Sequence, residues 1–156
     1  MAYVTSGSQH IDNYINIDHA QPHTTSRLYY RGILDDNSRA VFGGMVLVRE
    51  GAVKADAYQE DKNLLLSDKA EVDSKPSLEI YADDVKCGHG ATAGTIADDA
   101  MFYMRSRGLD EKTAQVFLVK GFANEILDEV RVGPLRTYLE KATMGALSTL
   151  RKERNA

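Results

Sequence analysis

The stretch DDVKCGHGATAG (residues 83–94) lies at the border between two kinds of sequence and carries the only cysteine of the chain. Cys87 lies two positions before His89, with Gly88 between them and Gly90 after them. In an extended backbone, side chains two residues apart point to the same side, so this pair can face one ligand. Thiolate and imidazole both bind iron or zinc, and the glycines permit close approach or unusual dihedral angles. Two other interpretations stay open: a reactive thiol, or a tight turn in which Cys87 packs as a small hydrophobe.

Before residue 95, short β-type segments alternate with turn signals. Many short strands separated by turns are typical of a sandwich, a barrel or a β-solenoid, so the pattern alone leaves these folds open. The predicted strands are residues 28–30, 40–42, 45–48, 64–66 and 78–81, and the predicted turns are residues 35–38, 43–44, 50–51 and 73–76.

After residue 96 the pattern predicts helices. Asp98 and Asp99 place acid in a first helical turn, and Gly108 is suited to end that helix. Asp110 can cap a second helix, and the Gly133-Pro134 pair predicts the start of a third. The predicted apolar face of the second helix is Ala114, Leu118, Phe122, Ile126 and Val130, widened by Phe117 and Gly121. The predicted face of the third helix is Leu135, Leu139, Ala142, Ala146 and Leu150, followed by a charged tail at residues 151–154.

Composition excludes several classes of protein. The chain has 156 residues, enough to bury a real core, and its formal net charge of −4 argues against nucleic acid or an anionic membrane as the main partner. No apolar run reaches the roughly 18 residues of a transmembrane helix, and the N-terminus has no signal-peptide pattern, so we expect a reducing, cytoplasmic location. A single cysteine cannot form a site of several thiolates. A metal at Cys87 therefore needs ligands from histidines, carboxylates or a second chain.

Four stretches together resemble one known family. VKCGHGATAG (residues 85–94), followed by DDAMFYMRSRGL (residues 98–109), resembles the hallmark of the SufB/SufD family of iron–sulfur cluster assembly proteins. HAQPHTTSRLYYRGIL (residues 19–34) and KGFANEILDEV (residues 120–130) resemble the flanking segments of that family. Gly90 resembles the SufD branch, because the SufB branch tends to carry glutamate there.

The resemblance implies a fold. Family members have a right-handed parallel β-helix flanked by helices, so residues 1–95 are expected to form its last rungs and residues 96–156 a C-terminal helical region. Each rung of such a solenoid stacks on its neighbour to build a shared core. The N-terminal helical region and early rungs of family members have no counterpart here, so we expect a C-terminal part of a longer protein. Its open rung is then expected to associate with a second copy.

The resemblance also implies a function, that of a non-catalytic scaffold subunit. It would pair with SufB through the β-helices and bind the SufC ATPase through the helical region, where Phe117, Phe122 and Ile126 are candidate contacts. His89, with Cys87 as a weaker candidate, would be a ligand of a nascent iron–sulfur cluster shared with SufB. No cofactor is expected to stay bound to this chain alone, and the cluster would be transient.

Other functions are weighed against this one. The chain has no phosphate-binding glycine loop of the P-loop type, so ATP use by that route is not expected. A carbohydrate-cleaving β-helix enzyme would need convergent acids, but adjacent Asp83 and Asp84 would point to opposite faces of a strand and are better read as a solvated turn. The SufB paralogue, or a metal-binding β-helix protein using Cys87, His89 and an upstream histidine, stays as the alternative. The upstream histidines, His10, His19 and His23, do not have the spacing of a helical zinc motif and are expected at the surface or in turns.

Overall fold

The computed structural model describes the backbone of residues 1–153 and the side chains of residues 1–147. Leu150 and the predicted charged tail lie outside the described side chains. Within residues 1–153, seven strands are followed by three helices. The bounds are β1 (Ala2–Thr5), β2 (His10–His19), β3 (Thr25–Leu34), β4 (Arg39–Val48), β5 (Asp56–Leu65), β6 (Glu71–Ile80), β7 (Lys86–Gly94), α1 (Asp98–Ser106), α2 (Glu111–Leu127) and α3 (Gly133–Glu153).

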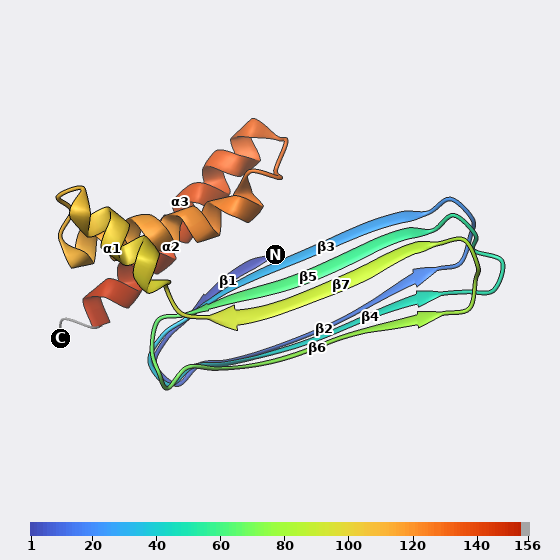
Figure 1. The fold of residues 1–156 in the computed structure, drawn as a ribbon, viewed down its shortest axis with the longest axis horizontal. Helices are drawn as coiled ribbons and strands as arrows, with labels where there is room; N and C mark the ends of the chain where they lie inside the picture. The colour runs from blue at the N-terminus through green and yellow to red at the C-terminus, as the bar shows by residue number, and fades with distance from the viewer. Residues whose placement is uncertain (154–156) are drawn as a thin grey trace.

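The chain winds between two parallel sheets and adds one strand to each in turn (Figure 1). The strand order is β1-β3-β5-β7 in the sheet we call sheet A, and β2-β4-β6 in the sheet we call sheet B. Consecutive strands therefore lie in opposite sheets, and each strand pairs with the strand two places along the chain. This arrangement is a solenoid of stacked rungs. It confirms the predicted parallel β-helix followed by a small helical region, since a hairpin-built barrel would need antiparallel neighbours.

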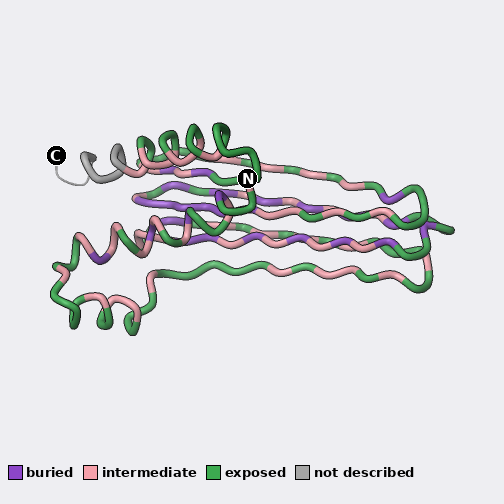
Figure 2. Tube along the Cα trace, turned by 90° about the horizontal axis from the view of Figure 1, so that it is seen from above, coloured by how far each residue is buried: buried purple, intermediate pink, exposed green. Residues whose placement is uncertain are grey.

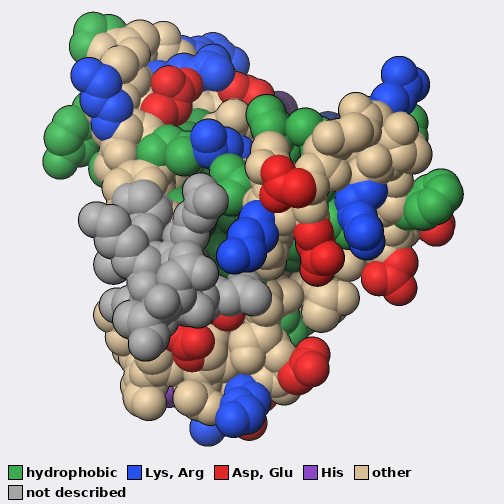
Figure 3. Space-filling view, turned by 90° about the vertical axis from the view of Figure 1, so that its left-hand side faces the viewer, with side chains coloured by type: hydrophobic (Ala, Val, Ile, Leu, Met, Phe, Trp, Pro, Cys, Tyr) green, Lys and Arg blue, Asp and Glu red, His purple; other side chains and the backbone are tan. Residues whose placement is uncertain are grey.

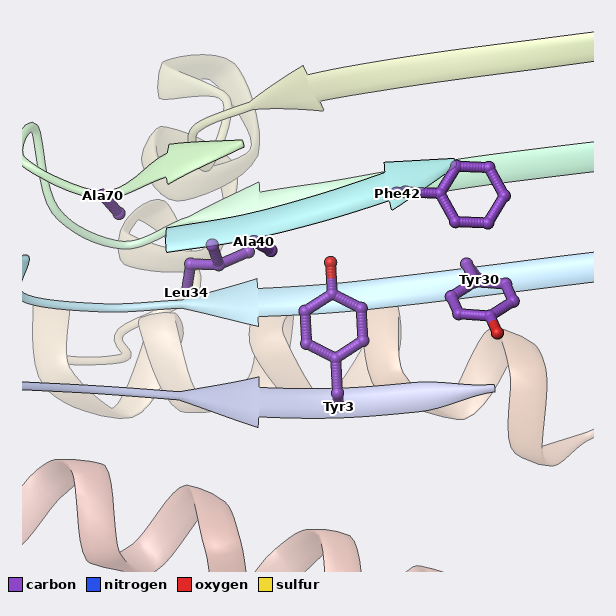
Figure 4. Close-up of a cluster of buried hydrophobic side chains, with 6 residues drawn as sticks. All are labelled: Tyr3, Tyr30, Leu34, Ala40, Phe42 and Ala70. Carbon is purple, nitrogen blue, oxygen red and sulfur yellow. The ribbon is translucent and has the colours of Figure 1, made fainter. Parts of the chain in front are cut away.

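The space between the two sheets, called the lumen below, is filled by alternate residues of each strand. Along β4, buried residues alternate with more exposed ones over the whole strand, as expected when one face points inward. Tyr30 of β3 packs against Phe42 of β4 across the lumen, with ring centroids 4.8 Å apart (Figure 4). Phe42 is 1% exposed, and full burial of such a side chain contributes about 1.5–3 kcal/mol. The buried residues of the middle strands form the core that holds the rungs together (Figure 2).

Two predicted turns lie inside strands and were wrong. Residues 43–44 lie within β4, and residues 73–76 lie within β6. Gly44 faces the lumen, where a Cβ atom would lie 2.4 Å from Gln59 Oε1, so glycine here makes room for the core. Pro76 is tolerated because β6 is the last strand of sheet B and has a free edge.

The other two predicted turns form corners of the solenoid. Residues 35–38 separate β3 from β4, and residues 50–51 separate β4 from β5. Asp36 and Gly51 have positive φ angles of 54° and 81°, in the left-handed region that aspartate and glycine adopt more readily than most residues.

The helix boundaries were predicted well, but the buried face of α2 was not. Asp110 accepts a hydrogen bond from the Thr113 backbone N–H as the N-cap of α2, and Gly108 has the positive φ angle of 88° typical after a helix end. Of the predicted α2 face, Ala114 is buried as expected, but Leu118, Phe122 and Ile126 are only half-buried and Val130 follows the end of the helix. The buried residues of α2 are Ala114, Val119, Ala123 and Leu127. The helix is apolar around most of its circumference, so its spacing fits more than one face.

The helices pack against the outer face of sheet A, near the ends of β3 and β5 (Figure 1). Ile33 and Leu64 of the sheet form one buried cluster with Val119 and Ala123 of α2. The predicted apolar face of α3 makes less of this contact: Leu135 is 47% exposed, Ala142 and Ala146 are also exposed, and Leu139 is half-buried. Leu147 packs against the cluster instead.

Candidate functional site

Cys87 and His89 both lie on β7, the last strand of sheet A, and not in a tight turn. Cys87 pairs in register with Ala57 and His89 with Gln59, two residues of β5 that face the lumen. Side chains of register partners point to the same face, so Cys87 and His89 both face the lumen side. The same-side geometry expected from their spacing is therefore present. The chain turns earlier, at residues 82–84, where Asp84 has a φ angle of 53°.

The lumen is open above β7. Sheet B ends at β6 in the described part of the chain, so β6 lies against β7 but no later strand of that sheet covers the far side of β7. His89 is consequently exposed, whereas its register partner Gln59, one strand below, is 1% exposed. Figure 2 shows the strand that leads into α1 as largely exposed. Among the described contacts, His89 makes no hydrogen bond or ion pair, and its imidazole is accessible to an external group.

Cys87 has different surroundings from His89, although the two residues share a face. Its side chain is half-buried and packs against an apolar cluster that includes Val46, Val48 and Ala57. Leu78 of β6 packs against the same cluster. A free thiol in such a place behaves as a small hydrophobe. The structure thus brings the two residues to one end of the lumen but leaves only His89 open to solvent.

The glycines of β7 are not required by the fold. Gly88 and Gly90 lie in extended strand and have no positive φ angle, contrary to the expectation of unusual dihedral angles. A Cβ atom at Gly88 would lie 3.5 Å from the Tyr58 ring, and one at Gly90 would lie 3.7 Å from the Tyr58 hydroxyl. These are ordinary van der Waals distances, so close approach is not needed either. The glycines instead leave the outer face of the last strand nearly bare.

The three upstream histidines do not join His89. His10 begins β2 and is exposed, and His23 lies in the corner between β2 and β3. His19 ends β2 and is 3% exposed, with Nδ1 2.7 Å from Thr24 Oγ1 and Nε2 2.8 Å from Ser26 Oγ. The expectation of a surface or turn position was wrong for His19, because it is the last residue of β2 and its buried ring contacts the hydroxyls of Thr24 and Ser26.

No ready metal site is formed by the side chains that the structure describes. Within residues 1–147, no group of three or more His, Cys, Asp or Glu side chains is placed to hold a metal ion. Asp83 and Asp84 lie in the bend before β7, and Asp84 forms an ion pair with Lys54. Among the side chains of residues 1–147, His89 therefore has no ready set of further metal ligands around it.

The three candidate partner-binding residues on α2 do not form one exposed surface. Phe117 is 54% exposed, whereas Phe122 packs against the buried cluster between α2 and sheet A. Ile126 is half-buried. Sequence reasoning missed the other large exposed apolar residues of this region, which are Phe102, Tyr103, Val132, Leu135 and Tyr138. Figure 3 views the molecule from the helical end, where hydrophobic side chains reach the surface among charged ones.

The two free sheet edges at the open end of the lumen differ in character. β6 carries Pro76 and charged side chains at Glu71, Asp73, Lys75 and Glu79. Proline and charge discourage a further strand from pairing with an edge. After Lys86, β7 carries only small uncharged residues and His89, and nothing in its sequence hinders strand pairing.

None of the helices described, within residues 1–153, is long and apolar enough to cross a membrane.

Residues 1–122 match the family model described as SUF system FeS cluster assembly, SufBD core domain. The chain is 45% identical over 115 residues to iron-sulfur cluster assembly protein SufD of Escherichia coli strain K12, an overlap covering 74% of this chain and 27% of that protein. It is 40% identical over 138 residues to an iron-sulfur cluster assembly SufBD family protein of Synechocystis, covering 88% of this chain and 30% of that protein. Identity to SufD of Bacillus subtilis is 33% over 108 residues, covering 69% of this chain and 25% of that protein. The chain spans about a quarter to a third of the length of these relatives.

Proposed function

Since the chain belongs to the SUF system FeS cluster assembly SufBD core domain family, we propose that it acts as a non-catalytic scaffold subunit of an iron–sulfur cluster assembly complex. Membership in the family gives a role in iron–sulfur cluster assembly. The scaffold role, the partners and the cluster ligands are the proposal. The similarity to SufD relatives favours the SufD branch over the SufB branch.

The observation that carries the proposal is the exposed His89 at the open end of the lumen. A neutral imidazole binds iron, and this one has no competing hydrogen bond among the described residues. The lack of further ligands around it within residues 1–147 fits a shared site, in which a partner subunit supplies the remaining ligands. Cys87 is the weaker candidate, because its packing against an apolar cluster supports a structural role.

We place the partner SufB at the β7 edge. An unpaired strand presents a row of backbone N–H and C=O groups that a second strand can bind, and β7 lacks the proline and charges found on β6. Pairing there would bring a partner β-helix directly over His89. The same edge would serve a homodimer of the isolated chain.

The helical region, residues 96–156, is the proposed docking region for the SufC ATPase. Its support is the group of large apolar side chains left exposed on α1, α2 and the start of α3, of which Phe117 is one. Exposed apolar patches on a soluble surface mark binding sites more often than chance. On this proposal Phe122 and Ile126 support the docking surface from beneath, and Phe117 contacts the partner.

The proposal is tested by co-expressing the chain, within its full-length protein, with SufB and SufC. We expect the three proteins to purify together and to assemble a cluster, measured by iron and sulfide content and by visible absorbance. His89→Ala should leave the complex intact and reduce the cluster content at least tenfold. His23→Ala, at an exposed histidine of the β2–β3 corner, is the matched control and should change neither.

Two outcomes would contradict the proposal. Full cluster content in the His89→Ala complex would remove His89 from the ligand set. Failure of the wild-type protein to purify with SufB or SufC would remove the scaffold role and leave only the family and the fold. Cys87→Ala separates the two candidate ligands, because a structural thiol predicts a normal cluster content in that variant.

A further inference from the structure

Asp61 is a carboxylic acid sealed inside the lumen. Asp61 lies in the middle of β5 and faces the space between the two sheets, and it is 0% exposed to solvent. Within residues 1–147, no lysine or arginine faces the lumen from any strand. Arg31 is the cation whose charge acts on Asp61, and it lies on the outer face of sheet A, where it is paired with Glu60. An ionised Asp61 would therefore be a buried charge without a partner cation.

The hydrogen bonds around Asp61 are too few for an ionised carboxylate. Oδ2 accepts one hydrogen bond, from Asn63 Nδ2 at 2.8 Å. The other amide atom of Asn63 is occupied, because Tyr3 donates its hydroxyl to Asn63 Oδ1 at 2.6 Å. The Tyr3 ring reaches from β1 past β3 to make this contact (Figure 4). Asp61 Oδ1 is buried and has no well-aligned hydrogen bond.

Ser74 of sheet B also has a buried polar atom that lacks a well-aligned hydrogen bond. The residue lies on the lumen side of β6, and the atom is its Oγ. Ser74 lies close enough to Asp61 for its hydroxyl to act on the carboxyl group. A hydroxyl can accept as well as donate a hydrogen bond, so one proton placed between the two groups would satisfy both buried oxygens.

We infer that Asp61 is a neutral carboxylic acid in the folded chain, with its proton on Oδ1 and donated to Ser74 Oγ. The lumen of the β-helix is then a binding site for one proton, held between its two sheets. The direction of the Asp61 pKa agrees with a protonated carboxyl: burial raises the pKa and outweighs the Asn63 hydrogen bond and the Arg31 charge, which lower it. The Ser74 hydroxyl lowers this pKa only when it donates to the ionised form, which is the opposite arrangement and the one that the Ser74 variant below tests.

The groups around the site carry no compensating positive charge. Tyr30 on β3 and Tyr3 on β1 are the titratable groups facing Asp61, and burial raises the pKa of both, with the Asp61 charge as a further cause. The other neighbouring strands place uncharged residues near Asp61. These are Ala91 of β7, in register with Asp61, Ser74 of β6, and Phe42 of β4, which packs against Tyr30. His89 lies two residues before Ala91 on β7. Loss of the proton would place a negative charge between β5 and β6, directly below the last strand. Proton binding at Asp61 thus makes the end of the solenoid that carries His89 sensitive to pH.

The test is a ¹³C NMR titration of the 156-residue chain with labelled aspartate carboxyl groups. Asp61→Asn identifies the Asp61 resonance by its loss, and asparagine is close enough in shape to keep the fold. We expect that resonance to stay in its acid form at pH values where carboxyls with the ordinary aspartate pKa of about 3.9 are fully ionised. Asp73→Asn is the matched control. Asp73 lies next to Ser74 but points outward to Arg39, and this hydrogen bond lowers its pKa, so its resonance should be among the first to ionise.

A second variant decides where the proton lies. If Ser74 accepts the proton of neutral Asp61, Ser74→Ala removes that acceptor and shifts the Asp61 titration midpoint downward. If Ser74 instead donates to an ionised Asp61, the same variant shifts the midpoint upward, and the inference is wrong. An Asp61 resonance that ionises together with the exposed aspartates would also overturn it.

Discussion

Gly32 and Gly88 are both strand glycines of sheet A, yet only Gly32 is required by its surroundings. A Cβ atom on Gly32 would lie 2.2 Å from Asn63 Oδ1 and 2.4 Å from the Tyr3 hydroxyl. The nearest atom to a Cβ at Gly88 is 3.5 Å away. The difference reflects position in the solenoid: Gly32 lies beneath a hydrogen bond inside the lumen, whereas Gly88 lies on the outer face of the last strand.

This contrast gives a stability prediction. Gly32→Ala forces a methyl group into a filled space, and overpacking of this kind costs about 1–3 kcal/mol of unfolding free energy. Gly88→Ala should change the unfolding free energy by no more than about 0.5–1 kcal/mol, because the added methyl fits and the unfolded chain loses some entropy. Urea unfolding of the two variants measures both values. Equal effects would mean that the space above Gly32 can relax.

Residue spacing predicted part of the site and could not predict the rest. The separation of two between Cys87 and His89 correctly placed both side chains on one face. Their different exposure depends on packing against Ala57 of β5 and Leu78 of β6, which the spacing within β7 does not reveal. The buried positions of His19 and Asp61 were missed for the same reason, because only the stacking of strands decides which polar residues are enclosed.

At the scale of single elements, the strands were harder to predict than the helices. The alternating pattern of β4 would serve equally well in a sandwich, and the parallel β-helix came from the family resemblance and not from periodicity. β2 and β7 were not among the predicted strands: the first alternates isoleucine with polar residues, and the second is rich in glycine and alanine. The helix ends were easier to predict, because Asp110, Gly108 and Pro134 are residue types typical of helix starts and ends. Their effect depends on local backbone geometry and not on the packing of distant strands.

Arg31 of β3 forms ion pairs both within sheet A and with α2. Its guanidinium is nearly buried and lies 2.6 Å from Glu60 Oε1 and 3.3 Å from Glu125 Oε2 of α2. Burial acts to raise the pKa of Glu60, but the Arg31 hydrogen bond and charge outweigh it, and the pKa lies below its usual value. Such a pair contributes its full stability above the ordinary glutamate pKa of about 4.3, and this contribution is lost as the pH falls from there through the lower pKa of the folded state.

We therefore predict that Arg31→Leu destabilises the chain strongly at neutral pH. Without Arg31, Glu60 keeps only the more exposed Lys62 as a charged partner, and the loss should reduce the unfolding free energy by up to about 3–5 kcal/mol. The deficit relative to wild type should shrink as the pH falls and Glu60 becomes protonated. Lys62→Gln is the control, because Lys62 is more exposed and its pairs are worth about 0–1 kcal/mol. A deficit that does not change between neutral and acidic pH would show that Arg31 acts through packing alone.

At the scale of the whole molecule, the solenoid has one protected and one unprotected edge at its open end. We predict that the isolated chain associates with a second copy through β7. Thr92→Glu adds a charge to the outer face of β7, beside Lys62 of β5, and should weaken this association at least tenfold, equivalent to about 1.4 kcal/mol.

Light scattering at increasing protein concentration measures this association. Ser77→Glu places the same charge on β6, at an exposed outward position, and should have little effect. A wild-type chain that stays monomeric at every concentration, or equal effects of the two variants, would contradict pairing through β7.

The hydrogen bond from Tyr3 to Asn63 gives this solenoid an unusual kind of cooperativity. Repeat proteins are commonly described as one-dimensional chains in which each unit interacts only with the next. Here the first and third strands of sheet A that carry these residues, β1 and β5, interact directly across Gly32 of the strand between them. A model in which each rung interacts only with the next one leaves out this hydrogen bond between the first and third rungs. Fraying of the first rung would therefore weaken the third rung as well, and the solenoid should unfold in larger steps than one rung at a time.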